Sequence, residues 1–233
     1  MKDAPLIEVC VDSLESARAA EAAGADRIEL CQALFEGGLT PSAGLLESVR
    51  KHVCLEIAVM IRPRGGDFCY TEDEFEVMKR DLVWAKTHGA ELVVLGVLGP
   101  DGMIHRERTR ELCDLAAPLP VTFHRAFDMS ADPRVALETL IDLGVERVLT
   151  SGQERTALEG LDLIVELVRQ AGDRIIVMPG GGLSERNLAK VLRVSGANEF
   201  HVSAGSTRES EMTFRNPRVA MGQQVGPPEY QVR

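Results

Sequence analysis

The clearest pattern in the chain is a pair of short alternating segments separated by one amphipathic stretch. In residues 7–10, apolar positions alternate with Glu8 and Cys10, and the same alternation returns in residues 28–31. A period of two is typical of β-strands, whose successive side chains point to opposite faces. Residues 13–23, between the two segments, are rich in Ala and Glu and favour a helix. This order of strand, helix and strand predicts two parallel neighbouring strands.

The two strands carry the same polar side chains on the same face. If they pair in register, Cys10 lies beside Cys31 and Glu8 lies beside Glu29. Two thiols and two carboxylates would then share the inner face of the sheet.

Strand and helix patterns alternate through the rest of the chain. The six further strands are expected at Leu55–Arg62, Glu91–Leu98, Pro120–Ala126, Arg147–Ser151, Arg174–Pro179 and Glu199–Ser203. The helices between them are expected at Pro41–Lys51, Asp73–His88, Glu107–Ala116, Pro133–Leu143, Thr156–Arg169 and Ser184–Val194. Eight parallel strands in 233 residues predict an α/β fold, a (β/α)₈ TIM-type barrel in a single domain. A doubly wound open sheet is the alternative, but its early Gly-x-Gly-x-x-Gly turn is missing.

The last part of the chain breaks this alternation. We assign residues 1–204 to the barrel and 205–233 to an irregular tail, which contains Asn216-Pro217 and Gly226-Pro227-Pro228 and no helix pattern. A barrel of this type normally has an eighth helix at this point. We therefore expect the tail, or a second subunit in a homo-oligomer, to cover the first and last strands.

Composition narrows the possible partners and the compartment. The net charge is −10, from 26 basic and 36 acidic residues, which argues against a nucleic-acid partner. No apolar run approaches the ~20 residues that span a bilayer, and no signal pattern precedes the first strand. The five cysteines form no disulfide framework, so we expect no membrane association and a reducing cytoplasmic setting.

Residues that could bind a ligand or take part in catalysis follow the strands, at the end of the barrel where the active face lies. Arg62 and Arg64 flank a proline and precede two glycines, which suits the binding of a carboxylate or phosphate. The alternative is that both arginines pair with barrel carboxylates such as Glu8 and Glu29.

A second group of candidates follows the fifth, seventh and eighth strands. His124 is expected to face inward and, with Glu29, to carry acid-base chemistry, although a structural histidine is the alternative. Gly180–Gly182 can contact an anion through backbone N–H groups or simply form a tight turn, and His201 and Ser203 are expected to face inward beside them.

The two inner thiols have a soft-metal interpretation. Thiolates on adjacent strands suit Cu(I), so Cys10 and Cys31 are candidate ligands. The alternative is plain packing, since free cysteine is often buried and no four-ligand zinc pattern is present.

Several long motifs resemble the CutC copper homeostasis family. They are Glu8–Asp12, Ala25–Cys31, Glu36–Ser42, Ile61–Tyr70, Val121–Asp128 and Leu149–Gln153, within a resemblance from about Leu6 to Asn216. The resemblance implies a TIM-type barrel, a cytosolic setting and a role in copper handling, with Cys10 and Cys31 matching the two cysteines proposed to hold Cu(I). Many members carry a last helix after the segment matching Glu229-Tyr230, where this chain stops at Arg233.

Two functions remain open at this point. The first is a copper homeostasis protein that binds Cu(I) through Cys10 and Cys31, with help from His201 or a methionine. The second is an enzyme that acts on a small anionic metabolite. The enzyme accounts for more residues, because a copper carrier has no use for two arginines that would repel the ion. The family resemblance favours copper handling, which we expect as the function.

Overall fold

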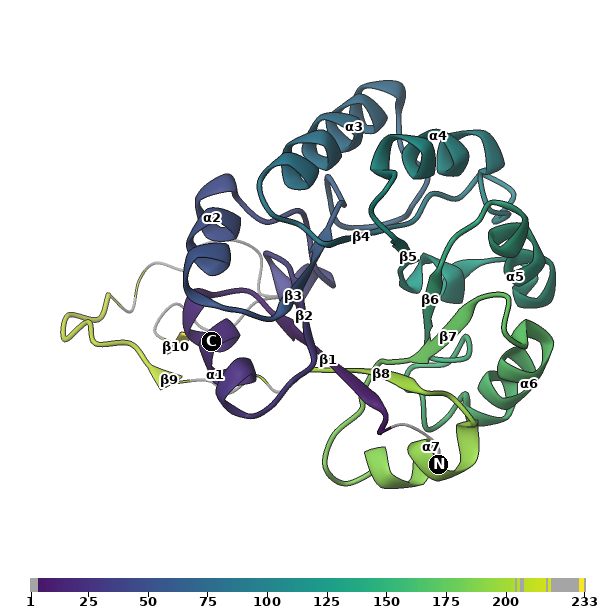
Figure 1. The fold of residues 1–233 in the computed structure, drawn as a ribbon. Coiled ribbons are helices and arrows are strands. Elements are labelled where there is room, and N and C mark those ends of the chain that lie inside the picture. The colour runs from purple at the N-terminus through teal and green to yellow at the C-terminus, as the bar shows by residue number, and fades with distance from the viewer. Residues whose placement is uncertain (1–3, 204, 206–207, 217, 219–230, 233) are drawn as a thin grey trace. The chain divides into compact units, whose positions relative to one another are not determined.

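The computed structural model describes residues 4–203, 205, 208–216, 218 and 231–232. Eight parallel strands form one sheet in the order β7-β6-β5-β4-β3-β2-β1-β8, and Figure 1 shows them as a ring surrounded by helices. The strands are β1 (Leu6–Val11), β2 (Arg27–Leu30), β3 (Glu56–Met60), β4 (Leu92–Leu95), β5 (Val121–Phe123), β6 (Arg147–Thr150), β7 (Ile176–Pro179) and β8 (Glu199–Val202). The predicted TIM-type barrel is confirmed.

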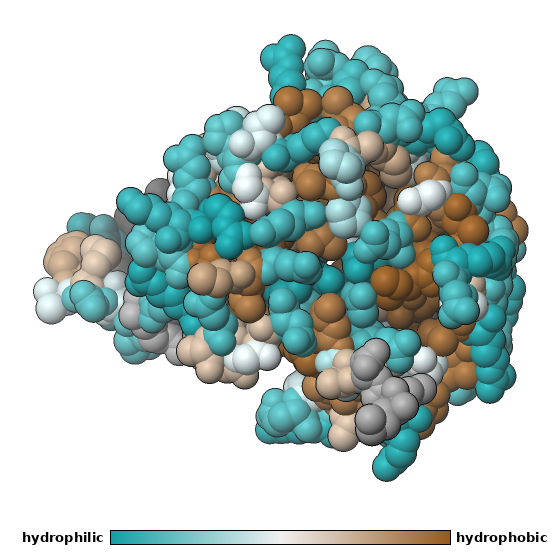
Figure 2. All heavy atoms as spheres, viewed as in Figure 1, coloured by the Kyte–Doolittle hydropathy of each residue, from teal (hydrophilic) through white to brown (hydrophobic). Residues whose placement is uncertain are grey.

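Seven helices alternate with these strands on the outside of the ring in the described part of the chain. They are α1 (Leu14–Ala22), α2 (Ala43–His52), α3 (Glu72–Thr87), α4 (Arg106–Ala116), α5 (Pro133–Asp142), α6 (Leu161–Ala171) and α7 (Leu188–Ser195), with 3-10 turns η1 (Leu34–Glu36) and η2 (Arg125–Met129). The main apolar core lies between strands and helices and includes Ile57, Val59 and Leu82. Figure 2 shows hydrophilic residues along the outer edge of the ring.

Most helix boundaries lie at capping residues that can be identified in the sequence. Thr71 and Glu74 form a capping box at the start of α3, as expected, which satisfies two N–H groups at once. Helices α6 and α7 begin more than one helical turn later than predicted. Helix α6 starts after Gly160, whose position lies so close to Ser151 that a Cβ would fall 2.0 Å from the Ser151 carbonyl oxygen. Helix α7 starts at Leu188, because Ser184–Asn187 close a separate turn.

The first two strands do not pair in register, so this prediction was wrong. Cys10 is the backbone partner of Glu29, and Glu8 is the partner of Arg27. A closed barrel requires tilted strands and a stagger between neighbours, which accounts for the two-residue offset. The thiols of Cys10 and Cys31 meet across this stagger rather than side by side.

The barrel closes at two different seams. Strands β1 and β8 pair in parallel, with Glu8 opposite His201. Strands β7 and β8 lie side by side without a ladder of backbone hydrogen bonds among the residues that the structure describes. Gly180 lies just beyond β7, where a Cβ would come within 3.0 Å of the His201 Cβ. A glycine is therefore needed for β7 to approach β8.

Contacts divide the chain into two units, Met1–Ser203 and Ala204–Arg233. In the second unit, strands β9 (Arg208–Glu209) and β10 (Gln231–Val232) pair in antiparallel fashion, which the sequence did not predict. The expected packing of the tail involves residues 217 and 219–230, which lie outside the described residues. Among the described residues, no helix has the length and apolar character needed to cross a membrane.

Candidate metal and acid-base site at the barrel mouth

Strands β1, β2 and β8 bring five reactive side chains together inside the barrel. The Sγ atoms of Cys10 and Cys31 are 3.8 Å apart, and Cys31 Sγ lies 3.4 Å from an oxygen of Glu29. His201 from β8 connects the two carboxylates, with Nδ1 2.8 Å from Glu8 and Nε2 3.6 Å from Glu29. The inward positions of Cys10, Cys31, Glu29 and His201 agree with the alternation of the sequence.

Glu8 is the fixed negative charge of this group. Its side chain is fully buried and accepts a 2.5 Å hydrogen bond from Arg27. Burial opposes ionisation, but the hydrogen bond with His201 and the positive charges of His201 and Arg27 outweigh it and lower the pKa of Glu8 to about 2. Burial alone would lower the pKa of His201, but Glu29, Cys10 and Glu8 raise it well above its usual value. Glu8 and His201 therefore form a buried carboxylate–imidazolium pair at neutral pH.

Arg27 is held on both sides by carboxylates. Besides Glu8 it donates to Glu199 at 2.7 Å, and Glu199 in turn accepts from Arg147 at 2.6 Å. Arg27 was not predicted as part of the site. Its place, like that of Arg147, at an inward position of a strand could have indicated a buried charged group. We call Arg27, Arg147 and Glu199 the charged floor of the site, because Arg27 connects this group to Glu8 of the mouth.

The two thiols titrate in opposite directions. The hydrogen bond with Cys31 is the main reason why the pKa of Cys10 falls to about 5, against the effect of burial. The same hydrogen bond, together with burial, raises the pKa of Cys31 well above its usual value. Burial, followed by the negative charge of Cys10, raises the pKa of Glu29 well above its usual value. Cys10 is thus a thiolate at neutral pH and Cys31 keeps its proton, while Glu29 loses its proton less readily than an ordinary carboxyl group.

The donor set fits a soft metal ion. Two groups of side chains lie close enough to share an ion, Cys10–Glu29–Cys31 and Glu8–Glu29–His201. A metal–thiolate bond is about 2.3 Å for zinc, so sulfurs 3.8 Å apart can both reach one ion without moving. Cys10 and Cys31 would hold such an ion, with Glu29 as the adjacent donor, and thiolates select Cu(I) or zinc over hard cations.

The loop after β2 covers this sulfur pair. Gly38 has φ +90°, and a Cβ there would lie 3.1 Å from Cys31 Sγ and 3.5 Å from the methyl group of Met60. Only glycine adopts this backbone without strain. The close approach leaves Cys31 fully buried. Among the methionines of the barrel interior, Met60 therefore lies beside Cys31, whereas Met178 contacts Arg27.

The arginines after β3 do not pair with Glu8 or Glu29, so that alternative was wrong. Arg62 is buried and donates to the carbonyl oxygens of Glu36, Gly38 and Gly66 at 2.7–3.1 Å. Arg64 pairs with Glu74 at 2.6 Å and Asp67 at 3.0 Å on the outer side of the loop. Arg27 and His201 take the carboxylates instead, because they lie on strands that face them directly.

His124 lies inside the mouth on the opposite side from the thiols. Its Nδ1 accepts the N–H of Ala126 at 3.1 Å, so the neutral ring carries its proton on Nε2. Burial, reinforced by the charge of Arg62, lowers the pKa of His124 to about 3. The ring occupies the space above Gly96, where a Cβ would fall 2.5 Å from it, and it contacts the ring of Phe68. His124 is therefore a neutral hydrogen-bond donor rather than a base at neutral pH.

The rim beyond β5, β6 and β7 contains a network that the sequence analysis missed. Asp128 accepts hydrogen bonds from Thr150 (2.5 Å), from the backbone N–H of Ser151 (3.0 Å) and from Arg125 (2.7 Å). Arg125 also lies against Gly181, where a Cβ would come within 3.1 Å of its guanidinium carbon. The Asp four residues after His124 was the signal that could have found it.

The remaining predicted anion residues form a second part of the rim. Gly180 packs on His201, Gly181 packs on Arg125, and a Cβ at Gly182 would fall 2.7 Å from the Thr156 side chain. Ser203 is exposed just beyond the end of β8. The three glycines thus serve close packing of this loop, and they do not converge with Arg62 or Arg64.

Comparisons with known proteins agree with the geometry of the barrel. A family model described as the CutC family matches residues 5–206. The copper homeostasis protein cutC homolog of Homo sapiens is 58% identical over 228 residues, which cover 98% of this chain and 84% of that protein. A CutC family protein of Mesorhizobium japonicum is 50% identical over 94% of this chain and 84% of its own length.

Solved structures give the same result for the fold. A crystal structure of the copper homeostasis protein CutC from Streptococcus agalactiae has a TM-score of 0.81 and 32% identity, covering 84% of this chain and 97% of that chain. The structure named QR15, an aldolase, has a TM-score of 0.67 at 14% identity, over 87% of this chain and 92% of its own, and supports the fold alone. With a family model over residues 5–206 and relatives of this identity, the chain belongs to the CutC copper homeostasis family.

Proposed function

We propose that the chain serves copper homeostasis by holding Cu(I) between the thiolates of Cys10 and Cys31 at the barrel mouth. The observation that carries this proposal is the 3.8 Å separation of the two sulfurs, which one soft ion can bridge. Membership of the CutC family gives it independent support.

The charges around the thiols are compatible with a bound cation. Arg27, which belongs to the charged floor of the site, forms ion pairs with Glu8 and Glu199, so its positive charge is compensated. Arg62 and Arg64 are directed at backbone carbonyls and surface carboxylates, so their charges are also compensated. The electrostatic repulsion between these arginines and a bound Cu(I) ion is therefore weaker than expected from the sequence alone. Glu29 or His201 is the nearest source of a third ligand.

We also propose a reducing cytoplasmic setting, which the free cysteines support. All five cysteines are free, including the exposed Cys54 and Cys69. A site that works through paired thiolates needs them reduced, and the cytoplasm keeps them so.

Competition for Cu(I) tests the proposal. The reduced protein is titrated with Cu(I) against a chromogenic chelator, alongside a Cys10→Ser/Cys31→Ser double variant. A Cys54→Ser/Cys69→Ser variant is the matched control, because it removes two thiols that are exposed and outside the mouth. We expect tight binding by the wild type and the control and loss of at least 100-fold in affinity in the mouth variant. Equal affinity in all three proteins would exclude this site.

A second function, an enzyme acting on a small anionic metabolite, is favoured by polar atoms that lack partners. Among the described residues, buried side-chain atoms without a hydrogen bond include Glu29 Oε1, Arg62 Nε, Tyr70 OH and His124 Nε2. Unpaired buried polar atoms are costly, so they point to a group that completes them. Three of these four atoms are donors, which suits a carboxylate or phosphate oxygen.

In this second function, Arg62 and His124 would bind the anion and Glu29 would supply a proton. Glu29 is suited to the role because its raised pKa favours the protonated form. Arg64, the glycines 180–182, His201 and Ser203 remain as proposed rim contacts to the substrate. His124, with its lowered pKa, would act as a neutral hydrogen-bond donor.

Thermal shift assays with small anions test the enzyme proposal. We expect a dicarboxylate or phosphate monoester, but not the matched neutral alcohol, to raise the unfolding temperature of the metal-free protein. Arg62→Met should remove the shift, whereas Arg174→Met, a surface arginine paired with Glu138, should retain it. No selective shift across a broad panel of anions would contradict this function and leave the copper result unaffected.

The expected homo-oligomer also remains a proposal. Its support is the lack of an eighth helix after β8 among the described residues, where a barrel normally has one. Sedimentation equilibrium measures it directly, and a monomer at all concentrations would exclude it.

A further inference from the structure

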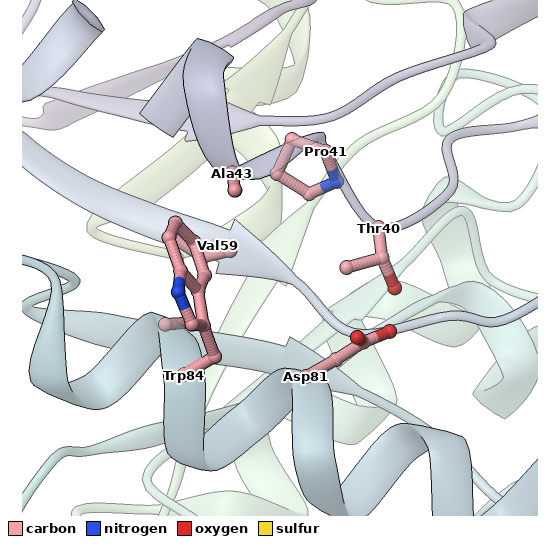
Figure 3. A pocket seen from close by; sticks show the side chains of 7 residues that line it. Thr40, Pro41, Ala43, Val59, Asp81 and Trp84 are labelled. Carbon is pink, nitrogen blue, oxygen red and sulfur yellow. The ribbon is translucent and has the colours of Figure 1, made fainter. Parts of the chain in front are cut away.

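A cavity lies on the outer side of the barrel, between the start of α2 and the middle of α3. It has a volume of about 170 Å³ and is lined by Thr40, Pro41, Ala43, Val59, Asp81, Trp84 and Ala85. Figure 3 shows Asp81 and Trp84 rising from α3 toward Thr40 and Pro41, with Val59 of β3 behind them. Val59 belongs to the core between strands and helices, whereas its neighbour Met60 faces the barrel interior. The cavity is therefore separate from the mouth.

The only charged group that lines this cavity is Asp81. Its carboxylate is half-buried, and no ion pair to it is formed within the described ranges. Thr40 is its hydrogen-bond neighbour, and burial raises the pKa of Asp81 despite this contact. The Thr40 hydroxyl is also 3.1 Å from the carbonyl oxygen of Arg62, to which it donates. Because a hydroxyl has a single proton, Asp81 keeps acceptor capacity that this neighbourhood does not fill.

Trp84 gives the cavity an aromatic wall. It lies three residues after Asp81 on α3, so both side chains emerge from the same face of the helix. One face of the indole stacks on His88 at 4.3 Å, which fixes the ring in place. Pro41, Val59 and Ala85 supply apolar surface around it. An aromatic ring beside an unpaired carboxylate, with apolar walls, is the arrangement that recognises an alkylated ammonium group.

We propose that this cavity binds a small organic cation, a quaternary or alkylated ammonium group, between Asp81 and Trp84. Its volume is comparable with the roughly 150 Å³ of an engineered cavity that holds benzene, so a ligand of this size fits. A bare metal ion is disfavoured, because Asp81 is the single carboxylate in the lining and the rest is mostly apolar. An anion is disfavoured by the same carboxylate, and the first turn of α2 is already capped by the Ser42 hydroxyl.

The chain provides its own reporter for this site. Trp84 is the only tryptophan in the sequence, so its fluorescence reports on the cavity without interference. The probe is choline chloride, compared with 3,3-dimethyl-1-butanol, which has the same shape and no charge, and with sodium chloride at equal ionic strength. We expect a saturable change in fluorescence with choline and at least a tenfold weaker response to the alcohol. A response that rises linearly without saturation, or is equal for both probes, would overturn the proposal.

Two variants separate a specific site from a general surface effect. Asp81→Asn keeps the shape of the side chain and should weaken choline binding at least tenfold, while Asp173→Asn, at an exposed position outside the cavity, should leave it unchanged. Ala43→Leu fills the cavity from the exposed start of α2 and should abolish binding with Asp81 and Trp84 intact. Circular dichroism verifies folding of each variant. Undiminished binding in both Asp81→Asn and Ala43→Leu would contradict the proposal.

Discussion

At the scale of single residues, the mouth owes its chemistry to two carboxylates in different surroundings. Glu8 contacts Arg27 and His201 and stays ionised, whereas Glu29 lies next to the Cys10 thiolate, and its pKa is raised well above its usual value. The difference follows from neighbours rather than from depth, since both are buried. A buried charge is tolerated only when its partners are in place.

Removal of the Glu8 charge should therefore destabilise the whole protein. Glu8→Gln leaves Arg27 and His201 facing a neutral group inside the barrel, and we expect a loss of about 3–5 kcal/mol in the free energy of unfolding. Urea denaturation followed by circular dichroism measures it. Glu138→Gln, which breaks an exposed pair with Arg174, is the control and should change stability little. Equal effects of both substitutions would contradict the role of burial.

His124 should make stability fall in acid. Its pKa is about 3 in the folded protein and 6.5 in a free side chain, so between these values the unfolded state binds the proton. Stability is retained above pH 6.5 and is lost as pH falls toward 3, by about 1.4 kcal/mol per pH unit from this residue. His124→Gln should remove that part of the slope in urea titrations between pH 7 and pH 4. An unchanged slope would show that His124 is already protonated in the fold.

At the scale of elements, the order of strands and helices could be predicted from the sequence, because each element depends on the residue pattern within its own segment. The alternation in β1 and β2 and the capping box of α3 are local, and the structure confirms them. The offset between β1 and β2 is not local. The offset depends on how eight tilted strands close into a barrel, and the sequence of a single strand does not determine this closure. For the same reason the partners of Arg62 and Arg64 could not be assigned from spacing.

Strand β4 shows how one element makes room for another. Gly96 lies beyond its end, directly beneath the His124 ring. Gly96→Ala should push this ring out of position and cost about 1–3 kcal/mol, as overpacked cores do. Gly44→Ala in α2 is the control, because nothing lies within 4 Å of the added carbon and alanine favours a helix. Thermal unfolding of both variants should move in opposite directions, and a stable Gly96→Ala would contradict the packing argument.

At the scale of the molecule, all eight barrel strands and the mouth residues lie in the first unit. Four members of the mouth, Cys10, Glu29, Cys31 and His201, could be predicted, because inward strand positions converge at the ends of parallel strands. The internal bonding of the mouth could not, because His201 and Glu8 find each other only through closure of the ring. The Asp128 network was missed for a related reason: its partners Thr150 and Ser151 come from a different strand.

A chain ending at Ser203 should therefore keep its fold and the Cu(I) affinity that we propose for the mouth. We expect its unfolding temperature to lie within a few degrees of the full chain, because the apolar core and ion pairs of the barrel are retained. Thermal unfolding by circular dichroism and the same chelator competition measure both properties. A large drop in the unfolding temperature would mean that the tail contributes to the stability of the barrel.

The contact between Glu8 and His201 joins residues 193 positions apart, nearly the full length of the barrel. During synthesis, both cysteines leave the ribosome long before the strand that carries His201. A growing chain thus presents both cysteines before the imidazolium that helps to lower the pKa of Cys10 is in place. The proposed binding of Cu(I) would consequently take place at different donor sets in the nascent polypeptide and in the finished protein, and the finished protein alone has the geometry described above.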